Sequence, residues 1–492
     1  MKNLQIGDND LIGSRFNGHD LHNYLNEAGI ESYHLVLKKY SVDKNTLEIV
    51  NKIKNSGHIN QIENYIEKKY STHGLFHTSS YEILFNHYFH NSDIVHYHLI
   101  HNNFFNISHL PILTKLKPSI WTLHDPWAIT GHCIHPFDCN RWIDGCGDCP
   151  YLNTNFPLVD DTTALNWEIK NIFYKSSNLD IIVASKWMFD LAKRSPLLSN
   201  FKIHLVPFGI NLGKFRPMDK NEAKSNLDIP KDSVVIGFRA VHSDFKGFDN
   251  IYRCIKNLNT KKPLCLLSFN EKTKMDEFKN KYMVKDLGWV YDENLLINAY
   301  NAIDIFLMPS DAEAFGMMAM EAMACGTPVI AFSNTALEET IFAPKGGIVV
   351  PKGDIAEMTK VLERLIQNPD ERHGIGITAR NLAIENYDYK KYVKQIIKIY
   401  EEVIDRNKPT ARIRYIISQL EKINSNNISK KSNDSYEFSK IDEKSMSDQS
   451  TQIEFLDMAI KFYEFKAIKF FFSKIFMPMY KIILNFIRKV LM

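Results

Sequence analysis

The stretch DIFLMPSDAEAFGMMAMEAMACGTPVIAF, residues 304–332, predicts a buried strand, a loop, a helix and a second strand. The apolar run IFLM ends at Pro309, as a short buried strand does. Helix-forming Ala, Met and Glu dominate GMMAMEAMA, and Gly326 with the nearby Pro328 predicts where this helix ends. VIAF is the second strand. Ligands of parallel sheets bind beyond the carboxyl ends of the strands, so the loop around Asp311 and Glu313 is the predicted site.

Two glutamates and a helix start determine the predicted chemistry of this loop. Glu313 lies before the helix and Glu321 inside it, so we expect the two carboxylates to hold separate parts of one long ligand rather than to form a touching acid pair. The helix start at Phe315, Gly316 and Met317 offers free backbone N–H groups and the positive end of the helix dipole, which suits a phosphate. The alternative interpretation is a glutamate-rich helix of an ordinary α/β protein.

The Glu-x7-Glu spacing, with the flanking PS, EAFG and EAMACGTPVIA, resembles the signature of the retaining glycosyltransferases of family 4, which have the GT-B fold. The resemblance spans residues 1–404 and implies an α/β protein with two Rossmann-like domains facing a cleft. It further implies that Glu313 faces the donor sugar, that the amides of Phe315 to Met317 hold the diphosphate, and that Glu321 holds the ribose hydroxyls.

Length and composition agree with this class. A chain of 492 residues is too long for one core, so two domains and additional segments are expected. Apolar residues make up 45% of the chain and charged residues 24%, which is typical of a globular protein. A net charge of +3 gives no case for nucleic-acid binding. The start MKNLQIGDND is too polar for a signal segment, so we expect a cytoplasmic protein.

The N-terminal domain is predicted to span residues 1–212 and to open with a strand, a glycine-containing loop and a helix. Glycine lets the backbone approach an anion closely, and the lack of a G-x-G-x-x-G motif argues against a nicotinamide dinucleotide. By resemblance, this loop closes over the donor phosphates and the acceptor, with Gly18 and Asn17 as its candidate residues. A simple turn is the alternative. The Asp-x-Asp of Asp8 and Asp10 is interpreted either as a metal–diphosphate ligand or as part of a polar loop.

A second informative stretch is PSIWTLHDPWAITGHC, residues 118–133. It predicts a strand with His124 and Asp125 at its carboxyl end, again on the site-bearing edge. By resemblance, His124 contacts the donor sugar beside the reacting carbon. Asp125 is predicted to orient His124, since a carboxylate can fix an imidazole tautomer. A strand-end histidine bonded to backbone is the alternative. His96 and His98 precede this stretch on one face of another predicted strand and are interpreted as polar groups at the cleft rather than as metal ligands.

Four cysteines follow within seventeen residues, Cys133, Cys139, Cys146 and Cys149. The C-x2-C pair with two further thiols suggests a structural zinc site with four thiolate ligands, although the first pair lacks the usual spacing. Reduced thiols in an ordered loop are the alternative, because disulfides are uncommon in the cytoplasm. The pattern HDPWAITGHC…FDC…GCGDCP also resembles a subgroup of these transferases associated with bacterial exopolysaccharide and lipopolysaccharide-type synthesis.

The C-terminal domain is predicted to span residues 213–404, with VVIGFRA as its first strand. Arg239 ends this strand and Lys246 follows it, so the two cations are predicted to clamp a diphosphate and to offset the charge that grows on a leaving nucleoside diphosphate. The resembled family carries a similar pair, and its base-binding loop corresponds to residues 289–294. Phe208 departs from that family, which usually has Asn there. Solvated surface charges are the alternative for the two cations.

The remaining residues lie outside the resemblance. Residues 405–450 are mostly polar and are predicted to be a disordered linker. Residues 451–492 are aromatic and basic, with lysines too frequent for a spanning helix. This pattern predicts an amphipathic helix that binds an anionic membrane surface. The helix would form a C-terminal helical extension of the fold. Docking of this helix on its own domain or on a partner is the alternative.

Together these observations predict a metal-independent hexosyltransferase. The resemblance implies that a sugar moves from a nucleotide sugar to a glycan or polyprenyl-linked acceptor with its anomeric configuration retained. We expect the protein to be cytoplasmic and peripheral on the inner face of the plasma membrane. Two other functions stay open: a nucleotide-sugar epimerase of the same fold, and a non-catalytic sugar-binding subunit.

Overall fold

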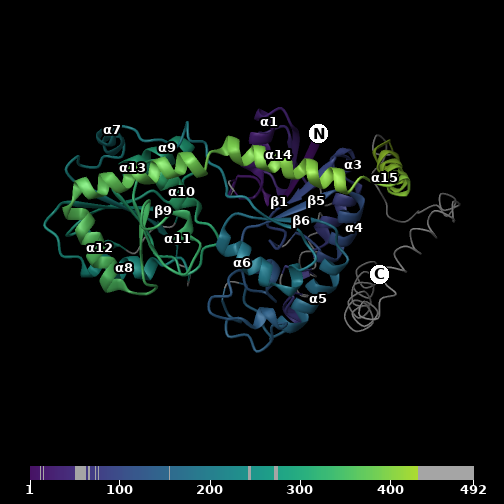
Figure 1. Ribbon diagram of the computed structural model, residues 1–492, viewed down its shortest axis with the longest axis horizontal. Coiled ribbons are helices and arrows are strands. Elements are labelled where there is room, and N and C mark those ends of the chain that lie inside the picture. Colours follow the sequence, from purple (N-terminus) through teal and green to yellow (C-terminus); the bar gives the residue numbers. More distant parts are fainter. Residues whose placement is uncertain are drawn as a thin grey trace, which may run out of the picture.

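The computed structural model describes residues 1–11, 13–14, 16–49, 63–64, 67–72, 74–75, 77–102, 104–154, 156–241, 245–270 and 275–429. Within these residues the strands form two parallel sheets, one of seven strands and one of six. Figure 1 shows them in two lobes, the N-terminal lobe on the right and the C-terminal lobe on the left. Both lobes alternate strands with helices, as expected of parallel sheets whose faces are both covered.

The N-terminal sheet has the strand order β3-β2-β1-β4-β5-β6-β7. Its central strands consist almost wholly of buried side chains, and all five residues of β5 are buried. The seven strands are β1 (Lys2–Asn9), β2 (Glu31–Lys38), β3 (Thr46–Glu48), β4 (Ile94–Tyr97), β5 (Ser119–Leu123), β6 (Asp180–Val183) and β7 (Ile203–Leu205). The order reverses between β1 and β4, and such a switch point is where open parallel sheets bind ligands.

The helices of this lobe connect successive strands. Their bounds are α1 (His19–Glu27), α3 (His87–Asn91), α4 (Leu110–Leu116), α5 (Thr163–Lys175) and α6 (Lys186–Arg194), with short 3-10 turns that include η4 (Pro126–Ile129). Helix α6 shows why such segments form where they do. Ser185 accepts a hydrogen bond from the Met188 N–H at its start, and Lys193 and Arg194 lie in its last turn, which is the favourable arrangement for the helix dipole.

The C-terminal sheet has the order β10-β9-β8-β11-β12-β13. Its strands are β8 (Val234–Ala240), β9 (Leu264–Asn270), β10 (Met283–Asp286), β11 (Ile305–Met308), β12 (Val329–Phe332) and β13 (Gly347–Val350). The helices of this lobe are α7 (Lys220–Ser225), α8 (Phe248–Asn257), α9 (Glu293–Ala302), α10 (Met317–Ala324), α11 (Leu337–Thr340), α12 (Ile355–Gln367) and α13 (Pro369–Asn386). The stretch from β11 through α10 to β12 is the strand, loop, helix and strand that residues 304–332 predict.

Helix α14 (Tyr389–Arg406) connects the lobes. It runs from the C-terminal lobe along the N-terminal lobe (Figure 1), where it contacts α1. Its buried Tyr400 accepts a hydrogen bond from Gln5 Nε2 at 3.0 Å and lies 2.7 Å from His96 Nδ1. One hydrophobic cluster includes Leu25 of α1, Phe208 of the connecting segment and Met320 of α10, so apolar burial holds the two lobes against each other.

The C-terminal segments differ in part from the sequence prediction. Residues 405–450 were expected to be a disordered linker, but helix α15 (Ala411–Ser429) occupies the first half of that segment. Its Leu420 is buried in the core of the N-terminal lobe, and this apolar contact offsets the polar composition on which the prediction depended. The amphipathic helix predicted for residues 451–492 lies outside the described residues. Among the helices that the structure describes, none is both long and apolar enough to cross a bilayer.

Candidate active site

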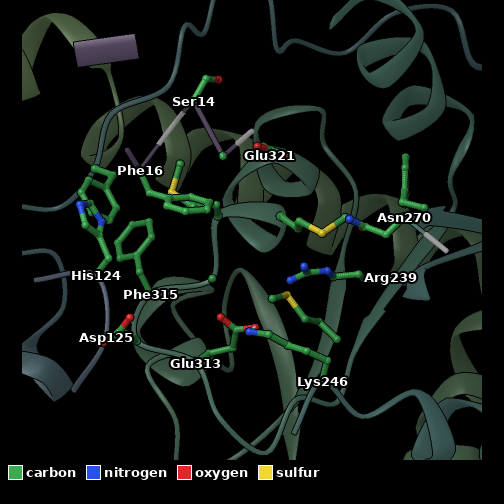
Figure 2. Close-up of a pocket in the computed structure, with 18 of the residues that line it drawn as sticks. Ser14, Phe16, His124, Asp125, Arg239, Lys246, Asn270, Glu313, Phe315 and Glu321 are labelled. Atoms are coloured by element: carbon green, nitrogen blue, oxygen red, sulfur yellow. The ribbon is translucent and has the colours of Figure 1, made fainter. Parts of the chain in front are cut away.

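A cavity of about 560 Å³ lies between the two lobes (Figure 2). Its wall includes Gly13, Ser14, Phe16, His124, Asp125 and His135 from the N-terminal lobe, and Arg239, Lys246, Asn270, Glu313, Phe315, Gly316, Met317 and Glu321 from the C-terminal lobe. The volume is that of a typical small-molecule site. The predicted site residues that lie on this wall are His124, Asp125, Arg239, Lys246, Glu313, Phe315, Gly316, Met317 and Glu321, whereas Asn17, Gly18, His96, His98 and Asp311 do not line the cavity.

Lys246 and Glu313 form an ion pair in this cavity. The Lys246 Nζ lies 2.6 Å from Glu313 Oε1, and the two side chains are only 16% and 11% exposed. Burial lowers the pKa of Lys246, and the nearby Glu313 carboxylate opposes that effect. A buried, paired cation of this kind is already oriented before any ligand binds.

A glycine brings the loop of this lysine against the loop of Glu313. Gly247 has a φ of 76°, and a Cβ at that position would lie 2.0 Å from the Pro309 carbonyl oxygen at the end of β11. Only glycine combines such a backbone with such a close approach. The Asp311 N–H donates to the Phe245 carbonyl at 2.9 Å and makes a second tie between the two loops. The loop of Lys246 follows β8 and the loop of Glu313 follows β11, and these two strands are neighbours in the sheet.

Arg239 supplies a second cation. It lies in β8, and its guanidinium points into the cavity beside Lys246 in Figure 2. Arg239 Nε is buried and has no hydrogen-bond partner among the described residues. The charge of Arg239 also acts to lower the pKa of Lys246. Two neighbouring cations with one unsatisfied buried donor form an arrangement that a bound anion would stabilise.

The start of helix α10 lies on the same wall. Gly316 precedes the helix with a φ of 98°, and a Cβ there would lie 2.4 Å from Leu337 Cδ2. Gly316 and Met317 both line the cavity, so the positive end of this eight-residue helix lies at the cavity wall. The structure therefore brings the helix start and the two cations to one place.

Glu321 lies one turn further along α10. It is 3% exposed yet lines the cavity, and its Oε2 accepts a hydrogen bond from the Tyr300 hydroxyl at 2.6 Å. Tyr300 belongs to α9 and is fully buried. The tyrosine thereby holds the carboxylate in one orientation, separate from Glu313 as the sequence predicted.

His124 is held from behind by a second histidine. His124 Nε2 lies 3.0 Å from His98 Nδ1, and His98 Nε2 lies 2.7 Å from Gln5 Oε1. Burial lowers the pKa of His124 to about 3 and that of His98 well below its ordinary value, so both rings are neutral. Gln5 Oε1 can only accept, which assigns the donor proton of His98 to Nε2. His124 Nε2 must then donate to His98.

This tautomer leaves His124 Nδ1 without a proton. The atom is buried and has no hydrogen-bond partner among the described residues. A buried acceptor of this kind is uncommon in folded proteins and marks a place that a ligand donor can satisfy. His124 is therefore equipped to accept a hydrogen bond and not to protonate a leaving group.

Asp125 was predicted to orient His124, but its carboxylate contacts other groups. Its Oδ2 lies 3.1 Å from His101 Nε2, and its Oδ1 accepts the Trp127 N–H at 2.9 Å at the start of η4. Burial alone would raise the pKa of Asp125, but His101 and the Trp127 N–H hold it below its ordinary value. The carboxylate thus fixes the turn that follows β5, and the orientation of His124 falls to His98.

The first loop contributes different residues from those predicted. Gly13, Ser14 and Phe16 line the cavity. Asn17 lies behind them, where its side chain donates to the Asp10 carbonyl at 2.8 Å and accepts the His19 N–H at 3.0 Å. A Cβ on Gly18 would lie 2.7 Å from the ring of His98. Gly18 therefore makes room for the histidine that holds His124, and Asn17 shapes the loop.

The Asp-x-Asp of this loop has structural contacts. Asp10 accepts hydrogen bonds from the backbone N–H groups of Leu11, Tyr40 and Ser41. Asp8 accepts from the side chains of Asn9 and Asn102, and burial raises the pKa of its carboxyl. These contacts agree with the polar-loop interpretation of the motif.

Phe208 is a site residue that sequence reasoning did not identify. Its ring stacks on His124 with centroids 5.4 Å apart and an interplanar angle of 12°, and it meets Phe315 edge-on at 5.2 Å. Phe208 thereby connects the histidine of one lobe with the helix start of the other. Its departure from the resembled family was visible in the sequence, but the stacking depends on how the two lobes meet.

Residues 219–382 match the model of the family described as glycosyl transferases group 1. They contain Arg239, Lys246, Glu313 and the α10 start. The matched residues all lie in the C-terminal lobe. The fold is GT-B, because the two parallel sheets match those of Anabaena HepE, solved in complex with UDP and glucose. That structure has a TM-score of 0.55 and 12% identity, and the match covers 82% of this chain and 100% of HepE.

Two curated relatives of this chain are named as glycosyltransferases. D-inositol 3-phosphate glycosyltransferase of Saccharomonospora viridis is 26% identical over 225 residues, which is 42% of this chain and 52% of the relative. WcaC of Escherichia coli K12, named as a colanic acid biosynthesis glycosyl transferase, is 23% identical over 286 residues, which is 54% of this chain and 66% of the relative. The chain thus spans about half to two-thirds of the length of these two relatives.

Proposed function

We propose that this protein is a glycosyltransferase that moves a sugar from a nucleotide-sugar donor to a glycan or lipid-linked acceptor. The observation that carries this proposal is the convergence of Arg239, Lys246 and the α10 start on one cavity between two lobes. Three positive groups around one point match the charge that develops on a departing nucleoside diphosphate. These protein cations supply the charge stabilisation, so the proposed reaction needs no metal ion.

The donor is proposed to lie along the C-terminal wall. Trp289 and Tyr291 line the outer part of the cavity and are 45% and 74% exposed, so their rings are accessible to stack on a base. Glu321 would then accept hydrogen bonds from the ribose hydroxyls, and the diphosphate would lie at Arg239 and Lys246. HepE was crystallised with UDP and glucose, which makes a uridine diphosphate sugar the first donor to test.

The sugar is proposed to lie between Glu313 and His124. The bare Nδ1 of His124 would accept a hydrogen bond from a sugar hydroxyl, and Glu313 would stabilise the positive carbon that forms as the diphosphate leaves. The acceptor hydroxyl attacks from the face that the diphosphate vacates and passes its proton to a phosphate oxygen. Retention of the anomeric configuration follows from the resemblance to family 4.

The acceptor is proposed to belong to cell-surface polysaccharide synthesis. The supporting observation is the similarity to WcaC. We further propose that residues 451–492, which lie outside the described residues, bind an anionic membrane surface through their lysines. Deleting them should abolish sedimentation with vesicles that contain anionic lipid and leave nucleotide binding intact. Unchanged sedimentation would reject the membrane proposal alone.

The central test combines binding with turnover. Thermal shift against nucleoside diphosphates and their sugars should identify a stabilising ligand, and Arg239→Ala should remove that stabilisation. The stabilising nucleotide sugar should then release its diphosphate only when an acceptor is present. Isomerisation of the sugar without an acceptor would indicate an epimerase, and binding without any turnover would indicate a sugar-binding subunit.

A further inference from the structure

The cysteine-rich segment between η4 and α5 forms a second site. Four of the seven cysteines surround one small cavity together with His132; they are Cys133, Cys139, Cys146 and Cys149. The other three cysteines are buried in the C-terminal lobe. The clustering of thiols is therefore a property of this segment and not of the protein as a whole.

Three of these groups are already close to the geometry of a metal site. The ligand atoms of His132, Cys133 and Cys149 all lie within 4.8 Å of one another, and His132 Nδ1 lies 3.3 Å from Cys133 Sγ. Ligand atoms around a tetrahedral zinc ion are roughly 3.5 to 3.8 Å apart, given zinc bonds of about 2.0 to 2.3 Å. Small side-chain rotations would close this set around one ion.

Burial and backbone conformation also agree with a metal site. His132 is 2% exposed, so its ring is held in the interior against the Cys133 thiol. The loop that carries Cys146 and Cys149 is a tight knuckle, in which Gly145, Cys146, Gly147 and Asp148 all have positive φ. Such a backbone is costly for non-glycine residues, and a bond from each end of the knuckle to one ion would compensate for it.

Cys146 is the candidate for the fourth ligand. It accepts the backbone N–H of Gly131, next to His132, at 3.3 Å, and it is the other half of the C-x2-C pair with Cys149. Cys139 lines the same cavity but is not part of a C-x2-C pair. Because the grouped ligand atoms include the imidazole of His132, the geometry favours one imidazole and three thiolates over the four thiolates that cysteine spacing alone suggested.

We propose that His132, Cys133, Cys146 and Cys149 bind one structural zinc ion. The ion would fix a wall of the active site, because Ile134 and His135 directly follow Cys133 and line the large cavity. The ring of His135 also stacks on Trp187 at 5.1 Å, which connects this wall to α6. Zinc is the metal of choice because imidazole and thiolate are its usual structural ligands and it has no redox chemistry of its own.

Elemental analysis of the full-length protein, purified with a reducing agent and zinc, tests the proposal. We expect one zinc per chain, lost in Cys149→Ser and His132→Ala and retained in Cys254→Ala, which removes a thiol of the C-terminal lobe. Cys139→Ser should also retain the metal. Loss of zinc in Cys139→Ser together with its retention in His132→Ala would overturn the ligand assignment in favour of four thiolates.

Cobalt substitution of the wild-type protein provides a readout that does not depend on folding of the variants. Tetrahedral cobalt with thiolate ligands should give an intense near-ultraviolet charge-transfer band, and zinc should displace it. Removing the metal with a chelator should lower the melting temperature without weakening nucleoside diphosphate binding in the other lobe. A wild-type protein that binds neither zinc nor cobalt, or that contains a disulfide among these cysteines under reducing conditions, would overturn the proposal.

Discussion

At the scale of single residues, the central feature is a cation kept in place by an anion. Lys246 is held by Glu313 at 2.6 Å, and Arg239 lies beside it with an unsatisfied donor. A diphosphate that entered this site would draw Lys246 toward itself while Glu313 turned to the positive sugar carbon. The separated pair would then place each charge where the proposed transition state needs it.

Replacing Lys246 by alanine should lower turnover on the order of a hundredfold, because losing one preorganised charge-stabilising group costs about 3 kcal/mol. The measurement is steady-state release of nucleoside diphosphate, with thermal unfolding to verify the fold. Lys262→Ala, which removes an exposed lysine of the same lobe, is the matched control and should have normal turnover. Near-normal turnover of the Lys246 variant would remove this cation from the mechanism.

The tautomer of His124 is a second prediction at this scale. Nitrogen NMR of the labelled wild-type protein should show the proton of His124 on Nε2 at pH 7, because His98 accepts there. His98→Leu should abolish that preference and lower turnover about tenfold, the cost of losing one buried hydrogen bond. His87→Leu, at an exposed histidine of α3, serves as the control. A His124 proton on Nδ1 in the wild type would contradict the assignment.

At the scale of elements, helix α6 of one lobe is capped by a residue of the other. Glu339 of α11 accepts the Lys186 N–H at 2.6 Å and the Trp187 N–H at 3.1 Å. Next to this contact, the Ser185 hydroxyl donates to the Ala314 carbonyl at 2.6 Å. A carboxylate at a helix start is favourable for the dipole, and here it also joins the lobes directly beside the Glu313 loop.

Glu339→Ala should therefore loosen the closed arrangement of the lobes. Loss of a helix cap typically costs about 1 kcal/mol, so we expect a raised donor KM and a larger radius of gyration in small-angle scattering. Glu338→Ala is the matched control, because its side chain is exposed on the same helix. If the Glu339 variant had an unchanged radius and KM, the cap would not contribute to closure.

At the scale of the whole molecule, buried neutral histidines make stability depend on pH. His96 and His22 are fully buried, and burial lowers their pKa values from 6.5 to about 3 and about 4. Between these values and 6.5 the unfolded chain binds protons that the folded chain excludes. The contribution of these two rings to the free energy of unfolding is therefore fully present above pH 6.5 and is lost as the pH falls toward 4 and 3.

The free energy of unfolding should decrease by about 1.4 kcal/mol per ring for each pH unit below 6.5. The melting temperature should thus fall steadily from pH 7 to pH 5 and change little from pH 7 to pH 8. Calorimetry in buffers of constant ionic strength measures this dependence. His96→Asn should reduce the slope, since one titrating ring is removed, and a flat profile between pH 7 and pH 5 would contradict the prediction.

The relation of sequence to structure differs between these scales. Apolar runs, helix-stop glycines and the charged residues at strand ends specify local structure, so they predicted alternating strands and helices and the strand ends that carry Glu313, Arg239 and His124. The arrangement in two parallel sheets was implied by the resemblance to family 4. The C-terminal segment shows the limit of composition: α15 forms in residues expected to be disordered, because its Leu420 finds an apolar partner surface in the N-terminal lobe.

By itself, the sequence determined the strands, the helices and the strand ends at which the site lies, because these depend on periodicity and on neighbouring residues, and its resemblance to family 4 implied the fold class. Only the tertiary structure decided that His98 rather than Asp125 orients His124, that Phe208 stacks on it, and that His132 joins the cysteines. Such contacts join residues from different strands and loops. Their geometry is decided by strand register, by the course of the loops and by how the lobes meet, none of which a local pattern encodes.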